Sequence, residues 1–118
     1  MPGLTPEQAV QHQLDAYNAH DLERFLEVYD DDVVVYRLPC REPAFTNRAE
    51  LAEFYATQRF SVPALRAELV NRMVIGNVVI DHERVHGLRD RPFEVAASYQ
   101  VRDGRIMSVW FFSGDQAG

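Results

Sequence analysis

The sequence contains no lysine: all twelve of its basic residues are arginines. Chemistry that needs a lysine amine is therefore excluded, including Schiff-base formation, attachment of pyridoxal phosphate and the lysine of a phosphate-binding loop. The six glycines are scattered, and none of the four serines lies in a Gly-x-Ser-x-Gly context, so glycine-rich phosphate loops and a serine nucleophile elbow are also excluded. These absences leave no motif for a cofactor, and we expect the protein to use none.

Cysteine and long apolar runs are nearly absent as well. Cys40 is the only cysteine, which excludes a disulfide within the chain. Neither an apolar leader nor an apolar run of about 18 residues is present, so we expect a cytoplasmic protein without a membrane partner. Twelve basic against eighteen acidic residues give a net charge of -6, which argues against a surface for nucleic acid.

What remains is the composition of one ordinary globular domain. The chain has 118 residues, fewer than the roughly 150 typical of a domain, so we expect a single domain over residues 1–118. Apolar residues make up 47%, and the aromatic residues are seven Phe, five Tyr and one Trp. This content is sufficient for a packed core without disulfides.

Capping signals predict two helices near the start of the chain. Residues 5–8 read Thr-Pro-Glu-Gln, with a capping threonine, a proline at the first helical position and a glutamine at the third. Apolar residues follow at helical spacing, which predicts a helix over about residues 6–18. Asp21 can cap a short second helix, which we expect to end at the acidic triplet 30–32.

A strand and a third helix are predicted next. Residues 33–36 read Val-Val-Val-Tyr, a β-branched and aromatic run that favours a strand. The strand stops at Pro39, and we expect an irregular stretch from there to Thr46. Asn47 begins another capping signal, which opens a helix with Arg59 in its last turn.

The second half of the chain has strand-like composition. Four such runs cover residues 65–75, 78–86, 93–102 and 105–113, separated by turn signals. The element order is therefore αα-β-α-ββββ, an α+β domain in which a curved, mixed or antiparallel sheet wraps around the N-terminal helices. Such a sheet commonly closes into a cone whose mouth is a small-molecule site.

Residues 82–86 read His-Glu-Arg-Val-His and match the His-Glu-x-x-His zinc motif. The motif requires a helix, which brings both imidazoles onto one face. Here it follows a β-branched run and precedes Gly87, and in a strand the two histidines lie ~13 Å apart. We therefore expect a strand at this position and no metal site.

Several stretches of the chain form a recognisable pattern: residues 16–22 (Ala-Tyr-Asn-Ala-His-Asp-Leu), 29–33 (Tyr-Asp-Asp-Asp-Val), 49–56, 103–106 (Asp-Gly-Arg-Ile) and 109–111 (Val-Trp-Phe). This pattern resembles the nuclear-transport-factor-2-like superfamily. The chain looks most similar to the polyketide-cyclase-like (SnoaL-like) and ketosteroid-isomerase-like branch. The resemblance implies a cone-shaped fold that hosts isomerases, dehydratases, cyclases, epoxide hydrolases and binding modules.

The catalytic residues of these relatives are not found at the matching positions. By resemblance, the oxyanion-hole tyrosine of ketosteroid isomerases falls at Gln13, their general-base aspartate at or near Arg37, and their neutral aspartic acid at about Ala97. The polyketide cyclases would place a histidine near Ala97 and an aspartate near Phe111. Neither set of proton-transfer groups is present, so neither mechanism is expected here.

Three polar residues remain as candidates. Gln13 and Tyr17 lie one turn apart on the side of the first helix that the family turns toward its cavity, where they can bind a ligand carbonyl or hydroxyl. Alternatively, Tyr17 is a core aromatic with its hydroxyl at the rim. Arg37 can bind a carboxylate or polarise a carbonyl, or it can be a solvated charge paired with the acidic triplet 30–32.

His82 is the candidate for proton transfer. Strand alternation puts His82 in register with Val78 and Ile80, so it is available near neutral pH if that face lines the cone. The hairpin register can equally turn Asp81 and Glu83 inward, and a histidine on a strand is more often a hydrogen-bonded structural residue.

The resemblance also implies an apolar lining and a dimer. The residues that would face the cavity are Phe54, Val95, Ala97, Tyr99, Val109 and Phe111, whose alternative role is core packing. Trp110 alternates away from Phe111, so it should lie on the opposite face of the sheet, through which we expect a homodimer.

These features predict a pocket for a small apolar or amphipathic molecule. We expect a cofactor-independent enzyme of isomerase, cyclase or dehydratase type that acts on an apolar, carbonyl-bearing substrate, with His82 and Arg37 as its catalytic residues. The alternative is a non-catalytic ligand-binding or dimerising module of the same fold.

Overall fold

The helices begin where the capping residues predicted them, as seen in the computed structural model, which describes residues 3–113. Helix α1 spans Pro6–Asn18 and starts with a reciprocal capping box between Thr5 and Gln8. The other two helices are α2 (Leu22–Leu26), capped by Asp21, and α3 (Arg48–Gln58), capped by Asn47.

One mixed sheet follows from the strand-like runs. Its strands are β1 (Tyr29–Arg37), β2 (Pro43–Phe45), β3 (Arg66–Ile75), β4 (Val78–His86), β5 (Phe93–Arg102) and β6 (Arg105–Ser113). Their order in the sheet is β2-β1-β6-β5-β4-β3. Strand β1 runs parallel to β6, and all other neighbours are antiparallel. The predicted α+β class and mixed sheet are confirmed.

Two details near β1 differ from the sequence prediction. Strand β1 begins at Tyr29, which was expected in α2, because Tyr29 pairs with Ile106 of β6. The stretch expected to be irregular contains the short strand β2, in which Phe45 pairs with Val35. Both differences arise from tertiary pairing, which local propensity does not encode.

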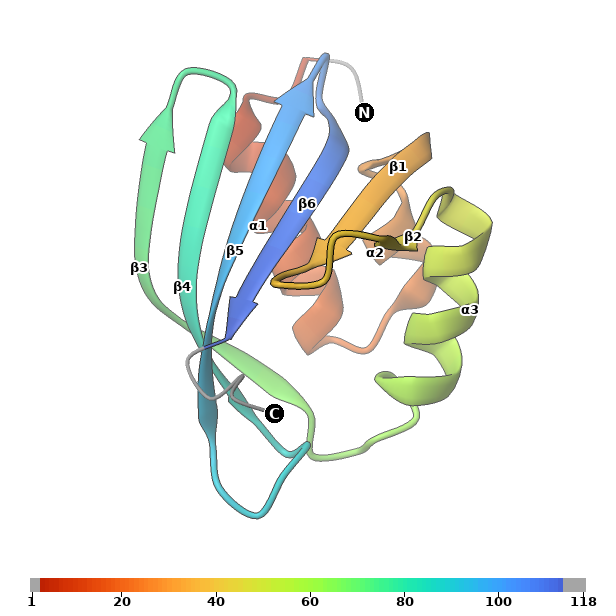
Figure 1. Cartoon of the computed structure of the whole chain (residues 1–118), viewed down its shortest axis with the longest axis vertical. Helices are drawn as coiled ribbons and strands as arrows, with labels where there is room; N and C mark the ends of the chain where they lie inside the picture. Colours follow the sequence, from red (N-terminus) through yellow and green to blue (C-terminus); the bar gives the residue numbers. More distant parts are fainter. Residues whose placement is uncertain (1–2, 114–118) are drawn as a thin grey trace.

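The helices cover the concave face of the sheet. Figure 1 shows α1 crossing behind the long strands, while α2 and α3 lie at the β1 and β2 side. The core between these layers includes Val10, Phe25, Leu51, Ile106 and Val109, each at most 1% exposed. No helix within residues 3–113 combines the length and apolar character needed to cross a membrane.

The loop between β4 and β5 closes one end of the cone. Gly87 has a φ of 91°, and a Cβ there would lie 2.2 Å from the Ala64 carbonyl oxygen. Only glycine therefore lets this loop pack against the connection between α3 and β3. Leu88 and Arg89, which follow Gly87 in this loop, line the pocket described next.

Candidate functional site

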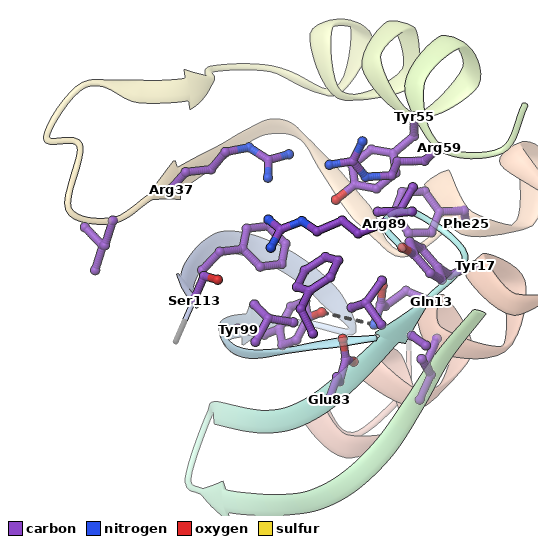
Figure 2. A pocket seen from close by; sticks show the side chains of 18 of the residues that line it. Gln13, Tyr17, Phe25, Arg37, Tyr55, Arg59, Glu83, Arg89, Tyr99 and Ser113 are labelled. Carbon is purple, nitrogen blue, oxygen red and sulfur yellow. Dashed lines mark hydrogen bonds between the residues drawn. The ribbon is translucent and has the colours of Figure 1, made fainter. Parts of the chain in front are cut away.

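A pocket of about 250 Å³ lies between the concave face of the sheet, α1 and the end of α3. Figure 2 shows side chains from these elements pointing into it. The volume is slightly below the range of about 300–1,000 Å³ that is usual for ligand pockets, so the space suits a small molecule. Apolar and aromatic side chains supply most of the wall, and a few polar groups converge within it.

The polar group at the centre of the sheet wall is the carboxyl of Glu83. Alternation along β4 turns Val79, Asp81, Glu83 and Val85 toward the concave side, where all four are buried. Glu83 is 7% exposed, and its Oε2 has no hydrogen-bond partner. Burial, followed by the nearby charge of Asp81, raises the pKa of Glu83 from 4.5 to about 7.

Asp81 is held in a bidentate pair with Arg72, two residues before Glu83 on the same face of β4. Arg72 of β3 donates from Nε to Asp81 Oδ1 (2.7 Å) and from Nη2 to Oδ2 (2.9 Å). Its Nη1 donates to Gln11 Oε1 of α1 (2.8 Å), which ties the strand pair to the helix. This fork-to-fork pair is stronger than neutral hydrogen bonds and keeps Asp81 in place on the buried face of β4.

A chain of hydrogen bonds crosses the pocket from β1 to β5. The Tyr29 hydroxyl donates to Gln13 Oε1, and Gln13 Nε2 donates to the Tyr99 hydroxyl oxygen, each over 3.3 Å. Burial raises the pKa of both tyrosines well above 10, so both phenols stay protonated at neutral pH. The Tyr99 hydroxyl hydrogen is thereby left to donate to a further acceptor.

Tyr17 lies both at the pocket and among the core aromatic residues, and its binding of a ligand stays a prediction. It lines the pocket, and it also packs edge-on against Tyr55 and Phe60, with ring centroids 6.3 and 5.6 Å away. Burial raises the pKa of the Tyr17 hydroxyl, which therefore stays neutral.

Three arginines meet at the mouth of the pocket. Arg37 ends β1, Arg59 follows α3, and Arg89 lies in the loop after β4 (Figure 2). The Arg37 guanidinium stacks near Phe54 and Phe111, with ring centroids 4.9 and 5.5 Å away. The predicted position of Arg37 at the cavity is confirmed, and its alternative pairing with the acidic triplet is wrong.

His82 does not lie at the pocket. It points to the outer face of the sheet, is partly exposed, and pairs with Glu94. The physical reason is register: β4 pairs Glu83 with Val95, which lines the pocket, and His82 with Ala96, which does not. Placing His82 at the cavity was therefore wrong, and the alternative register, with Asp81 and Glu83 inward, is the one observed.

The predicted lining is partly corrected. Val95, Tyr99 and Phe111 line the pocket along with Gln13, Tyr17 and Arg37. Ala97 and Val109 lie in the closed part of the cone, each at most 1% exposed, so they pack in the core. Phe54 lies behind Arg37 and supports the guanidinium instead of lining the space.

The sequence analysis missed three groups of the site. Glu83 appeared only as the alternative register, because β4 carries apolar and polar residues on both faces. Arg59 and Arg89 are far apart in sequence from each other and from Arg37, and no local pattern brings them together. The alternation of Ala97, Tyr99 and Val101 on β5, all three buried, was the available signal for the β4 register.

Two features of the outer face agree with the prediction. Trp110 stacks on Tyr36 across β1 and β6, with centroids 6.0 Å apart and planes at 8°. The His-Glu-x-x-His segment is a strand, and its outer histidines pair separately, His82 with Glu94 and His86 with Glu68.

Comparison with solved structures places this fold among known relatives. A cystatin-fold protein from Novosphingobium aromaticivorans has a TM-score of 0.83 at 20% identity, covering 93% of this chain and 99% of that one. A polyketide cyclase-like protein from Sinorhizobium meliloti has a TM-score of 0.76 at 19% identity, covering 88% and 93%. An epoxide hydrolase from M. tuberculosis has a TM-score of 0.77 at 16% identity, covering 92% and 81%.

Sequence comparison gives the family directly. No curated protein sequence matches the chain significantly. Residues 10–109, however, match the SnoaL-like domain over most of the chain, in agreement with the fold and with the resemblance noted in its motifs. The protein therefore belongs to the SnoaL-like domain family.

Proposed function

We propose that the protein is a cofactor-independent enzyme that transfers a proton on a small, apolar, carbonyl-bearing molecule. The observation that carries this proposal is the Glu83 carboxyl, which faces the pocket, is 7% exposed and has an unpartnered oxygen. Buried carboxyls are costly unless paired, so a buried carboxyl that opens onto a pocket is a candidate for chemistry.

The pKa of Glu83 suits proton transfer at neutral pH. A proton acceptor works best when its pKa lies near the operating pH, and burial brings Glu83 to about 7. The fixed charge of Asp81 contributes to this shift, and Arg72 opposes it. Glu83 thus takes the role that the sequence analysis assigned to His82.

The hydrogen-bond chain supplies the partner for the carbonyl oxygen. The Tyr99 hydroxyl oxygen accepts from Gln13, and Gln13 in turn accepts from Tyr29. The hydroxyl hydrogen of Tyr99 can therefore donate to a ligand. Such a chain polarises its last donor and strengthens the bond it makes to a developing oxyanion. Neutral phenols are retained because burial raises the pKa of these tyrosines.

The proposed step is an enolisation. The ionised Glu83 carboxylate takes a proton from the carbon next to the carbonyl, and the C–H electron pair forms the enolate double bond while charge moves to the carbonyl oxygen. Tyr99 donates a hydrogen bond to that oxygen. Glu83 then returns the proton to the same carbon or, in a conjugated substrate, to another carbon, which gives an isomer without an oxidant or cofactor.

Solvent exchange tests this step. Purified protein is incubated in D₂O with cyclic ketones, enones and aryl ketones, and deuterium incorporation is measured by mass spectrometry. We expect catalysed exchange in the compounds that stabilise the protein thermally. Its kcat/KM should rise with pH through about 7, because Glu83 must be ionised.

Matched variants assign the exchange to the pocket. Glu83→Gln keeps the size of the side chain and removes the proton acceptor, so exchange should be lost. His82→Gln changes the neighbouring residue on the outer face and should leave exchange intact. Compounds that bind without any exchange would refute the enzyme and favour a non-catalytic binding module of the same fold.

A further inference from the structure

The mouth of the pocket is rich in positive charge although the whole chain carries a net charge of -6. Arg37, Arg59 and Arg89 come from three separate segments, and Figure 2 shows their guanidinium groups gathered on one side of the pocket. Like charges held together repel one another, and they do so more strongly where water is partly excluded. An anion at this place would relieve that repulsion.

Arg37 is the most constrained of the three. Its guanidinium lies within 5.8 Å of the ring centroids of Phe45, Phe54 and Phe111, and its Nη2 is buried without a hydrogen-bond partner. Within residues 3–113 it forms no ion pair, and the acidic triplet 30–32 lies at the opposite end of β1, where Asp30 pairs with Arg105 and Asp31 with Arg48. A buried guanidinium N–H without an acceptor is rare, and it points to an acceptor supplied by a ligand.

Arg59 presents a second guanidinium to the same space. It lies over the Phe54 ring, 4.7 Å from the ring centroid, and donates from Nη1 to the Gln58 carbonyl oxygen. Burial lowers the pKa of Arg59, and the charges of Arg37 and Arg89 lower it further. The guanidinium groups of Arg37 and Arg59 therefore both lie over Phe54 at the mouth of the pocket.

We propose that the ligand of this pocket carries a carboxylate, which Arg37 and Arg59 bind at the mouth while its apolar, carbonyl-bearing part lies over Glu83 and Tyr99. The substrate class is then a small keto acid with an apolar or aromatic body. This deepens the proposed function by naming its substrate class. The binding of the carboxylate does not itself require turnover.

A carboxylate fits the mouth better than a larger anion. The planar fork of arginine matches the two oxygens of a carboxylate, and a carboxylate adds only three heavy atoms to the ligand. The small size of the carboxylate matters because the pocket has only about 250 Å³ for the whole ligand. The aromatic rings that flank Arg37 would also contact the apolar part of such a ligand.

Paired probes test the proposal. Calorimetry measures the affinity of a panel of aryl, alicyclic and alkyl keto acids, such as 3-benzoylpropionate, and of the methyl ester of each. We expect at least one acid to bind at least about tenfold more tightly than its ester, because hydrogen bonds to charged groups are the stronger ones. If no acid in the panel binds more tightly than its ester, the proposal is overturned.

Variants locate the preference. Arg37→Gln and Arg59→Gln should each reduce the acid-to-ester ratio toward one, whereas Arg102→Gln, which removes the same charge at the turn between β5 and β6, should leave it unchanged. Persistence of the ratio in both mouth variants would also overturn the proposal. Glu83→Gln should keep the preference while losing proton exchange, so failure of the carboxylate site and failure of the proposed enzyme give different results.

Discussion

Strand β4 carries charged residues on both of its faces, and the two sets of side chains differ in burial and in pairing. On the outer face, His82 pairs with Glu94 and Arg84 approaches Glu68, with all four side chains at least 38% exposed. Such exposed ion pairs contribute little to stability. On the concave face, Asp81 is fully buried in a fork-to-fork pair, and Glu83 is buried with one oxygen unpartnered.

Under the proposed function, burial rather than residue type determines which of these side chains transfers a proton. His82 has the side chain expected of a proton carrier, but it lies in solvent beside a carboxylate. Glu83 is an ordinary carboxyl by type, and its surroundings raise its pKa to about 7. His82 and Glu83 are adjacent in one strand but lie on opposite faces of the sheet. The register of β4 against β5 determines which of the two side chains faces the pocket.

The largest expected effect is a difference in exchange rate between variants of Glu83 and His82. Glu83→Gln should reduce the proposed proton exchange about 100- to 10,000-fold, which is the usual contribution of a positioned acid or base. His82→Gln should leave the rate unchanged. Deuterium incorporation under identical conditions measures both, and equal losses in the two variants would contradict the division between the faces.

The next effect compares a buried with an exposed ion pair. Asp81→Asn leaves the Arg72 guanidinium largely buried without its charged partner, and should lower the free energy of unfolding by about 3–5 kcal/mol. Urea denaturation followed by circular dichroism measures this loss. A loss below about 1 kcal/mol would show that the buried pair on the concave face contributes no more to stability than an exposed ion pair on the outer face.

The pH dependence of stability should have opposite signs on the two faces. Because the pKa of Glu83 is raised from 4.5 to about 7, the folded state holds its proton more tightly, and stability falls as pH rises between these values. The full effect is on the order of 3 kcal/mol. The exposed Glu68 has a lowered pKa, caused first by its hydrogen bond to His86, so it adds stability above its usual pKa that is lost on acidification.

Urea denaturation from pH 4 to 8 tests the signs. Glu83→Gln should remove most of the decline toward high pH, and Glu68→Gln should preserve it. An unchanged slope in Glu83→Gln would mean that the carboxyl does not titrate in this range.

The smallest effect is expected from the outer pair alone. Glu94→Gln removes the partner of His82, and both side chains are at least 44% exposed. The free energy of unfolding should change by no more than about 1 kcal/mol. A loss comparable with that of Asp81→Asn would show that the exposed pair between His82 and Glu94 stabilises the fold as much as the buried pair does.

Local signals predicted most of the fold. The caps at Thr5, Asp21 and Asn47 and the Asp103-Gly104 turn are encoded within a few residues, and all of them form as expected. Strand β2 was missed because it exists only through its pairing with β1. The expected homodimer through the face that carries Trp110 stays a prediction.

The site was predicted in part for the same reason. Helix periodicity and family resemblance placed Gln13 and Tyr17 at the pocket, and the strand end placed Arg37. The face of β4 depends on register with β5, which a single strand with apolar residues on both faces leaves undetermined. The gathering of Arg59 and Arg89 around Arg37 depends on the closure of the fold and leaves no trace in the local sequence.

The most direct test of the account is the titration of the Glu83 carboxyl itself. Carbon-13 NMR of protein labelled at the glutamate side-chain carboxyl follows each resonance against pH, and Glu83→Gln identifies the signal that disappears. The account predicts that this signal titrates near pH 7, well above the 4.5 usual for glutamate. Titration near 4.5 would show a solvated carboxylate and would contradict the claim that the concave face holds the proton-transfer group.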